Sequence, residues 1–183
     1  MGVYQLIGFL LASKGMTLVV SLLLALMKDQ VDSMKVLGHP VDPFASSLTL
    51  DEKIAVKIRV KNRQTIILYV APEQLNNEKT VDLIRSVPIS LLAIDEAHCI
   101  SEWGHAFQPD YLRLSKFYKD SNIDVKRVVA LTATATPDVE KDICDKFDID
   151  QEKNSVRTAF FRPNLKTFFT LTQNEKESNH KLV

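Results

Sequence analysis

The segment with the clearest chemical potential is an apolar run that ends in two carboxylates and a histidine. Residues 91–94 read Leu-Leu-Ala-Ile, and Asp95, Glu96, Ala97 and His98 follow directly. A continuous apolar run of this length is typical of a strand buried on both faces of a parallel sheet. In open α/β sheets the ligand lies beyond the carboxyl ends of the strands. Asp95 and Glu96 therefore predict a site for a nucleotide and Mg²⁺, although the alternative is the acidic first turn of a helix, where carboxylates suit the dipole.

A second unusual segment lies just downstream, at residues 101–111. It combines three aromatic residues with a histidine, a glycine and a proline, namely Trp103, Gly104, His105, Phe107, Pro109 and Tyr111. The aromatic residues recur every four positions, so the stripe of a core helix is the alternative. Gly104 and Pro109 disfavour that helix and favour an ordered functional loop. Exposed aromatic rings on such a loop stack on unpaired bases without sequence preference.

A second apolar run, residues 128–131, ends in hydroxyl groups. Thr132 and Thr134 follow it within the sequence Thr-Ala-Thr-Ala-Thr. One interpretation of these threonines is that they cap the next helix. This interpretation is compatible with a further, functional role.

The order of these segments resembles the first RecA-like domain of a RecQ-family DNA helicase, in the DEAH branch of helicase superfamily two. The resemblance extends from about Tyr4 to about Phe169, and the aromatic loop joined to the DEAH sequence is its most specific part. The matching segments are Thr17–Ser21 with Leu26–Gln30 (motif Ia), Leu68–Leu75 (motif Ib), Asp95–His98 (motif II), Ser101–Tyr111 (the aromatic loop), Leu131–Thr136 (motif III) and Phe161–Leu165 (the segment before a second RecA-like domain).

The resemblance implies ATP and Mg²⁺ as cofactors and assigns roles to particular residues. Asp95 would hold Mg²⁺, Glu96 would activate the attacking water, and both would line the nucleotide site. His98 would join this site to motif III, and His98, Gln108, Thr132 and Thr134 would couple hydrolysis to domain movement. Residues along the DNA strand would be Ser21, Lys28, Pro72, Glu73, Trp103, His105, Phe107 and Tyr111. For Lys28, a solvated position on a helix surface is the alternative.

Two positions depart from the family pattern. Leu22 stands where the family usually has proline, which relaxes the bend after the motif Ia strand. Gln108 stands where the family usually has arginine, so the loop loses a cation that communicates between DNA and ATP. Because glutamine donates hydrogen bonds but does not neutralise phosphate, we expect weakened coupling.

No phosphate-binding loop is present in the sequence. The five glycines are Gly2, Gly8, Gly15, Gly38 and Gly104, and none begins a G-x-x-x-x-G-K-[ST] pattern. Residues 3–6 resemble the family sequence just after that loop, so we expect a truncated domain that lacks the phosphate-loop strand. The expected organisation is a partial ATP-binding domain at residues 1–155 and a linker toward an absent second RecA-like domain at residues 156–183.

The implied function is that of a fragment of an ATP-dependent 3′-to-5′ DNA helicase acting in DNA repair and recombination. Its partners would be single-stranded and duplex or branched DNA, with docking to other helicase domains or repair proteins. We expect a nuclear location in a eukaryote and a cytoplasmic one otherwise. The alternative is a catalytically inactive nucleic-acid-binding or regulatory fragment.

Composition agrees with one globular domain and excludes a membrane-spanning protein. The chain has 183 residues, 45% of them hydrophobic, and a formal net charge of zero. No apolar run reaches the roughly 18 residues needed to span a bilayer. Cys99 and Cys144 lack metal-ligand spacing, so they predict no zinc site.

Helical and strand patterns alternate along the chain, which favours an α/β fold with a parallel sheet covered on both faces. Thr49 and Glu52 form a capping-box pattern at one helix start. We treat residues 41–47 as a turn-rich connector. The predicted helices span residues 5–13, 22–36, 49–60, 72–86, 112–118 and 137–147, and the four predicted core strands span 16–21, 66–70, 91–94 and 127–131.

Overall fold

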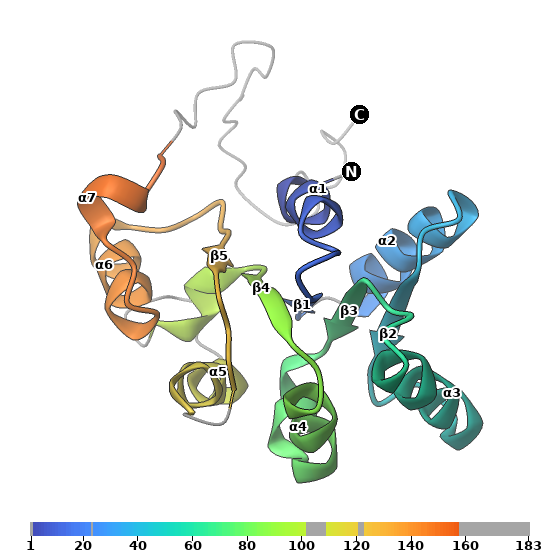
Figure 1. The fold of residues 1–183 in the computed structure, drawn as a ribbon. Coiled ribbons are helices and arrows are strands. Elements are labelled where there is room, and N and C mark those ends of the chain that lie inside the picture. Colours follow the sequence, from blue (N-terminus) through green and yellow to red (C-terminus); the bar gives the residue numbers. More distant parts are fainter. Residues whose placement is uncertain (1, 23, 102–108, 121–122, 158–183) are drawn as a thin grey trace, which may run out of the picture.

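The fold is built on one parallel sheet with the strand order β2-β3-β1-β4-β5 (Figure 1). The structure is a computed structural model that describes residues 2–22, 24–101, 109–120 and 123–157. The strands are β1 (Met16–Val20), β2 (Val41–Phe44), β3 (Ile67–Val70), β4 (Ile89–Ile94) and β5 (Val128–Ala130). The predicted parallel α/β architecture is thus confirmed.

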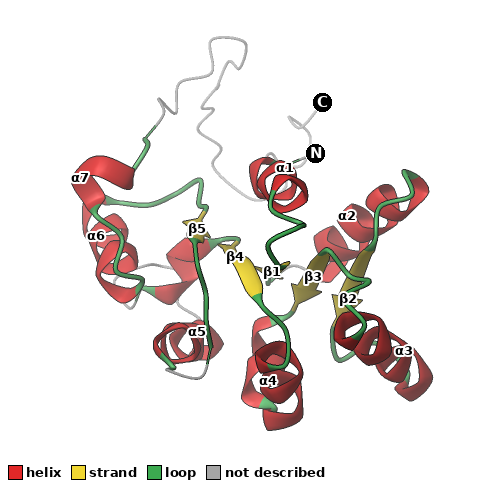
Figure 2. Ribbon diagram, in the orientation of Figure 1, coloured by secondary structure: helices red, strands yellow, loops and turns green. Residues whose placement is uncertain are grey.

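Helices cover both faces of the sheet (Figures 1 and 2). One face carries α1 (Val3–Leu10) and α2 (Leu24–Val36), and the other carries α3 (Leu50–Lys61), α4 (Glu78–Arg85), α5 (Pro109–Lys119) and α6 (Pro137–Lys146). The short helix α7 (Gln151–Asn154) follows α6, and the 3₁₀ helices η1 (Pro72–Asn76) and η2 (Ala97–Ile100) follow β3 and β4.

The core consists of two apolar clusters separated by the sheet. Along β4, Leu92 and Ile94 pack with the α3–α6 layer, whereas Ala93 between them packs with the α1–α2 layer. Every residue of β1, β3 and β4 is buried. This burial on both faces explains why the strands read as continuous apolar runs rather than as alternating patterns.

The register brings the carboxyl ends of the strands to one edge of the sheet. Val20, at the end of β1, pairs with Val70 of β3 and with Ile94 of β4. Ile94 in turn pairs with Ala130 of β5. The residues that follow these strands therefore meet along one line.

The connector predicted at residues 41–47 is wrong in part, because Val41–Phe44 forms β2. Pro43 removes one backbone donor, and a proline inside a run argues against a central strand. The structure accommodates Pro43 because β2 lies at the end of the sheet and pairs only with β3. Asp42, only 3% exposed, accepts hydrogen bonds from Arg59 of α3 and from Thr65, which fastens the edge strand to its neighbours.

Two predicted helices have different bounds in the structure. The helix expected over residues 72–86 is divided into η1 and α4, because the Asn77 side chain accepts a hydrogen bond from the Lys79 N–H and caps α4. The helix expected from Leu112 begins at Pro109 instead. Proline suits the first helical turn because the amide hydrogen it lacks has no partner there.

Strand β5 lies at the far end of the strand order, so one of its backbone edges has no strand partner among the described residues. Val128, Val129 and Ala130 are only partly buried. A cavity of about 500 Å³ lies along this strand and is bounded by α6 and by the segment after α7. Within the described ranges, no helix is long and apolar enough to cross a membrane.

Candidate active site

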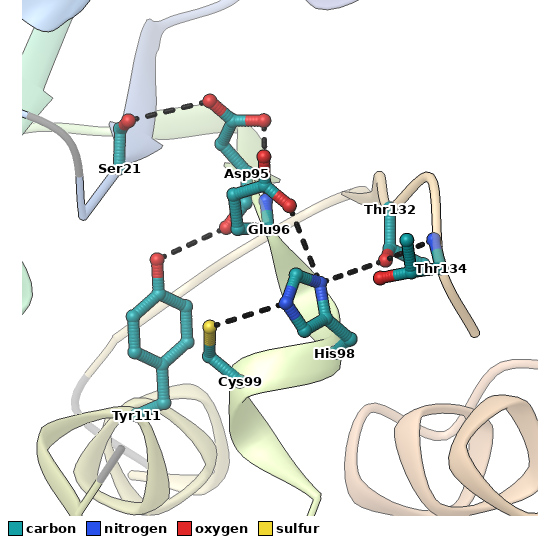
Figure 3. A network of polar contacts seen from close by, with 8 residues as sticks. All are labelled: Ser21, Asp95, Glu96, His98, Cys99, Tyr111, Thr132 and Thr134. Atoms are coloured by element: carbon teal, nitrogen blue, oxygen red, sulfur yellow. Dashed lines mark hydrogen bonds and ion pairs between the residues drawn. The ribbon is translucent and has the colours of Figure 1, made fainter. Parts of the chain in front are cut away.

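The residues that follow β1, β4 and β5 form a connected polar cluster at the carboxyl edge of the sheet (Figure 3). Ser21 follows β1, Asp95 and Glu96 follow β4, and Thr132 lies two residues beyond β5. Three of the sequence-predicted elements, motifs Ia, II and III, are thereby brought together.

Asp95 is held at the end of β4 by both its backbone and its side chain. Its N–H donates to the Val20 carbonyl oxygen at 2.9 Å, which continues the β1–β4 pairing by one residue. The Oδ1 atom accepts the Glu96 N–H at 3.1 Å, and Oδ2 accepts the Ser21 hydroxyl at 3.3 Å. These contacts fix the direction of the carboxylate toward the strand ends.

Glu96 has a left-handed backbone, with φ of 49° and ψ of 44°. A residue with a Cβ atom is strained in this region by roughly 1 to 2 kcal/mol, and such strain often occurs at functional sites. The turn at Glu96 separates β4 from η2, and it leaves the Glu96 side chain 35% exposed beside Asp95. Glu96 therefore combines a fixed backbone with a carboxylate that water reaches.

His98 connects Glu96 to the loop after β5. Its Nδ1 lies 3.2 Å from Glu96 Oε2 and 2.9 Å from Thr132 Oγ1. A proton on Nδ1 lets His98 donate to the Glu96 carboxylate, whereas a bare Nδ1 accepts from the Thr132 hydroxyl. Thr132 Oγ1 also accepts the Thr134 N–H at 3.3 Å. His98, Thr132 and Thr134 are therefore joined to the Glu96 carboxylate, as Figure 3 shows.

The backbone reinforces the same link. The Ala97 N–H donates to the Leu131 carbonyl oxygen at 2.9 Å, and the Leu131 N–H donates to the Ile94 carbonyl oxygen at 2.8 Å. The segment after β5 and the turn that carries Glu96 are thus joined through the backbone as well as through side chains.

Tyr111 differs from its expected place on the DNA. Its side chain is 0% exposed and lies in the α3–α6 core layer, and its hydroxyl donates to the Asp95 carbonyl oxygen at 3.0 Å. Burial is the largest cause of its raised pKa. A ring in this position has no free face for a base, so the stacking role expected of Tyr111 is corrected to support of Asp95.

The other residues expected on the DNA lie in different settings. Ser21 is buried and already bonded to Asp95, whereas Lys28 is exposed on α2. Pro72 is buried at the start of η1, and Glu73 beside it is partly exposed and accepts the Ser46 hydroxyl at 3.4 Å. Trp103, His105, Phe107 and Gln108 lie outside the described residues.

The donor set at Asp95 fits a hard divalent cation. Among the described residues, no lysine or arginine pairs with Asp95, and Glu96 pairs only with His98. Within the same part of the chain, no group of three or more His, Cys, Asp or Glu gathers as a metal cage. Mg²⁺ needs no such cage, because it commonly binds through one or two carboxylates, substrate phosphates and water.

Sequence reasoning missed the buried polar side chains beneath this edge, namely Gln5 of α1 and Tyr69 of β3. The Gln5 amide donates to the Tyr69 hydroxyl at 2.6 Å. The only sequence signal was a polar side chain within each of two apolar runs, which is too common to single out either residue.

Comparison with known proteins agrees with these motifs. Residues 3–143 match the DEAD/DEAH box helicase family. The chain is 38% identical over 153 residues to the ATP-dependent DNA helicase RecQ of Bacillus subtilis, covering 83% of this chain and 25% of that protein. It is 40% identical over 163 residues to the probable ATP-dependent DNA helicase RecS of the same species, covering 88% of this chain and 32% of that one. It is also 39% identical over 168 residues to ATP-dependent DNA helicase Q5 of Rattus norvegicus, covering 88% of this chain and 17% of that protein.

The fold also resembles that of a solved helicase structure. The Hef helicase domain of Pyrococcus furiosus superposes with a TM-score of 0.55 at 18% identity, covering 80% of this chain and 31% of that one. The chain thus spans between about a sixth and a third of the length of these relatives. With the DEAH residues at the carboxyl edge of a RecA-like parallel sheet, the chain belongs to the DEAD/DEAH box helicase family, and the resemblance to RecQ-type helicases that its motifs indicate is confirmed.

Proposed function

We propose that this chain supplies part of the first motor domain of an ATP-dependent DNA helicase that moves 3′ to 5′ on single-stranded DNA and unwinds duplexes. The observation that carries the proposal is the continuous link from Asp95 and Glu96 through His98 to Thr132. It joins a carboxylate pair suited to nucleotide hydrolysis to a second strand end, which is what a motor needs to turn hydrolysis into movement. The similarity to relatives that are ATP-dependent DNA helicases supports the same activity.

The proposed chemistry is in-line attack of water on the γ-phosphate of ATP. Bound Mg²⁺ would neutralise charge on the phosphate oxygens. Asp95 would hold the cation with the carboxylate that Ser21 and the Glu96 N–H orient. Glu96, partly exposed beside it, would orient the water and accept its proton.

His98 would sense the charge of Glu96. When Glu96 takes up a proton, its carboxyl group no longer attracts the proton on His98 Nδ1. The Nδ1 atom would then form its hydrogen bond with the Thr132 hydroxyl instead. The loop after β5 would respond because Thr132 also holds the Thr134 N–H. Gln108 would take part in this coupling from the aromatic loop.

The proposed DNA track runs past Lys28 on α2 and past Pro72 and Glu73 at the start of η1, with Trp103, His105 and Phe107 contributed by the aromatic loop. Lys28 is exposed and able to meet phosphate. Ser21 would act from beneath this track, because its hydroxyl already contacts Asp95. We propose single-stranded and duplex or branched DNA as partners, other helicase domains or repair proteins as docking partners, and the nucleus as the compartment in a eukaryotic host.

The test is a chimaera in which residues 3–157 replace the matching segment of the Bacillus subtilis RecQ relative. The proposal predicts ATP-dependent unwinding of a duplex with a 3′ single-stranded tail and little unwinding of one with a 5′ tail. DNA should also increase its ATP turnover. Equal unwinding of both substrates, or stable folding without DNA-stimulated turnover, would contradict the proposal.

A second candidate function is that of a catalytically inactive nucleic-acid-binding or regulatory module. It is favoured by the absence of a phosphate-loop pattern from the sequence. Residues 1–155 would then act as a partial domain, and residues 156–183 as a connecting segment. The chain by itself should bind oligo(dT) but show no DNA-stimulated ATP turnover, because its 183 residues contain no G-x-x-x-x-G-K-[ST] pattern to hold the phosphates. Turnover that Asp95→Asn abolishes would exclude this candidate.

A further inference from the structure

A buried polar network links three elements beneath the candidate active site. Tyr4 and Gln5 belong to α1, Gln30 to α2 and Tyr69 to β3. Tyr4, Gln5 and Tyr69 are 5%, 2% and 0% exposed, so their polar atoms depend on one another rather than on water. A fully bonded buried network is rigid, and the loss of one member leaves its partners unsatisfied.

Gln5 uses both ends of its amide. Its Oε1 accepts the Gly2 N–H at 2.6 Å and thereby fixes the start of α1. Its Nε2 donates to the Tyr69 hydroxyl, also at 2.6 Å. The first turn of α1 is therefore tied to the middle of the sheet through one side chain.

Tyr4 extends the network to α2. Its hydroxyl donates to Gln30 Oε1 at 2.6 Å. Burial is the main cause of the raised pKa of Tyr69, and the hydrogen bond that Gln5 donates to its hydroxyl opposes that rise. In the sheet register Tyr69 pairs with Val19 and Val19 pairs with Ala93, two residues before Asp95. The charge of Asp95 accordingly raises the pKa of both tyrosines.

Of the two elements that the network ties to α1, α2 carries a proposed DNA contact itself and β3 leads into the segment that carries two more. Lys28 lies on α2, two residues before Gln30. Tyr69 lies in β3, which leads directly through Ala71 into Pro72 and Glu73 of η1. None of the network residues has a role in the chemistry proposed above.

We propose that Tyr69 and Tyr4 are positioning residues that make the placement of α1 beside Asp95 depend on α2 and η1, so that bound DNA is sensed at the nucleotide site. This inference rests on the proposed function, because it needs DNA on α2 and η1. It adds a route through the α1–α2 layer to the link from Glu96 through His98 to Thr132.

The direct test uses the 183-residue chain and hydrogen exchange of the α1 backbone, residues 3–10. Saturating oligo(dT) should slow exchange there in the unsubstituted chain, and Tyr69→Phe should abolish most of that slowing. Tyr118→Phe is the matched control, because it removes a hydroxyl from the other helical layer. It should leave the DNA-induced slowing intact. Unchanged exchange in α1 on addition of DNA, or equal slowing in the unsubstituted and Tyr69→Phe chains, overturns the inference.

Tyr4→Phe is the second variant, and it separates the link to α2 from the link to β3. It breaks the link to α2 but keeps Gln5 bonded to Tyr69, so a partial loss of the slowing is expected. In the chimaera, the ratio of DNA-stimulated to DNA-free turnover should fall about fivefold or more with Tyr69→Phe. A ratio that stays constant while both turnovers fall would reveal a merely structural role. Failure of the unsubstituted chimaera to respond to DNA would count against the proposed function, while the exchange experiment would still decide the inference.

Discussion

Glu96 shows how a single residue can oppose the stability of the fold. Its left-handed backbone is a conformation that glycine adopts without cost. Glu96→Gly and Glu96→Ala both remove the carboxylate and its contact with His98, but only glycine relieves the strain. We expect Glu96→Gly to be more stable than Glu96→Ala by about 1 kcal/mol. Urea unfolding of the two variants measures the difference, and an alanine variant of equal or greater stability would show that Glu96 is not strained.

The placement of single side chains was predictable where they are adjacent in the sequence. Asp95, Glu96 and His98 follow an apolar strand directly, so their meeting place was implied by the pattern. Tyr111 was not predictable in the same way. The sequence does not indicate whether an aromatic residue near a functional loop faces DNA or the core. In the structure, Tyr111 is buried and contacts Asp95.

At the scale of elements, the approach of α1 to β1 depends on Gly8. A Cβ atom at this position would lie 2.8 Å from Thr17 Oγ1, a buried hydroxyl that has no hydrogen-bond partner among the described residues. Gly8→Ala should therefore destabilise the chain by about 1 to 2 kcal/mol, despite the better helix propensity of alanine. The measurement is chemical unfolding.

The same clash provides its own control. In a Thr17→Ala background, the hydroxyl that the new Cβ would meet is gone, so Gly8→Ala should cost at least about 1 kcal/mol less than in the unsubstituted chain. Gly2→Ala is a matched control, because a Cβ there meets no atom closer than 3.7 Å. Strictly additive effects of Gly8→Ala and Thr17→Ala would rule out the proposed contact.

The attachment of the segment after α7 to α6 should depend on pH. Glu140 of α6 accepts a hydrogen bond from Ser155 and pairs with Arg157 at 2.5 Å, and the Ser155 bond is the largest cause of its lowered pKa. A carboxyl with a lowered pKa in the folded state stabilises the fold above its ordinary value of 4.5. That contribution is lost as pH falls through the lowered value.

We therefore expect Glu140→Gln to unfold more easily than the unsubstituted chain at pH 7, with a difference that shrinks as pH falls below 4.5. Thermal unfolding at a series of pH values tests this expectation. Glu152→Gln, at an exposed position on α7, is the control and should show little difference at any pH. A Glu140→Gln difference that is independent of pH would contradict the assignment.

Strands with a strong apolar pattern were predictable, including the short terminal strand β5, whereas the edge strand β2 was not. The strands expected at residues 16–21 and 66–70 form β1 (Met16–Val20) and β3 (Ile67–Val70), and the capping box at Thr49 starts α3 as expected. Strand β2 was missed because Pro43 argues against a strand unless its place at the edge of the sheet is known. Edge position is a property of the whole sheet, so local sequence does not reveal it.

At the scale of the whole molecule, β5 has an edge that no other described strand covers. Its three residues are partly buried and lie along an open cavity. Such edges pair readily with other chains. We expect the 183-residue chain alone to be marginally stable or to self-associate. A monomer by sedimentation that unfolds cooperatively well above about 45 to 65 °C would contradict this and would mean that another segment covers the edge.

We propose that the Asp95–Glu96 pair divides nucleotide hydrolysis between a metal ligand and a base. The most direct measurement compares ATP binding and ATP turnover of Glu96→Gln in the chimaera with the Bacillus subtilis RecQ relative. Glutamine keeps the size of the side chain and leaves Asp95 free to hold Mg²⁺, so binding should remain within about threefold while turnover falls by about 10² or more. An equal loss of binding and turnover, or turnover that survives the substitution, would show that Glu96 is not the base.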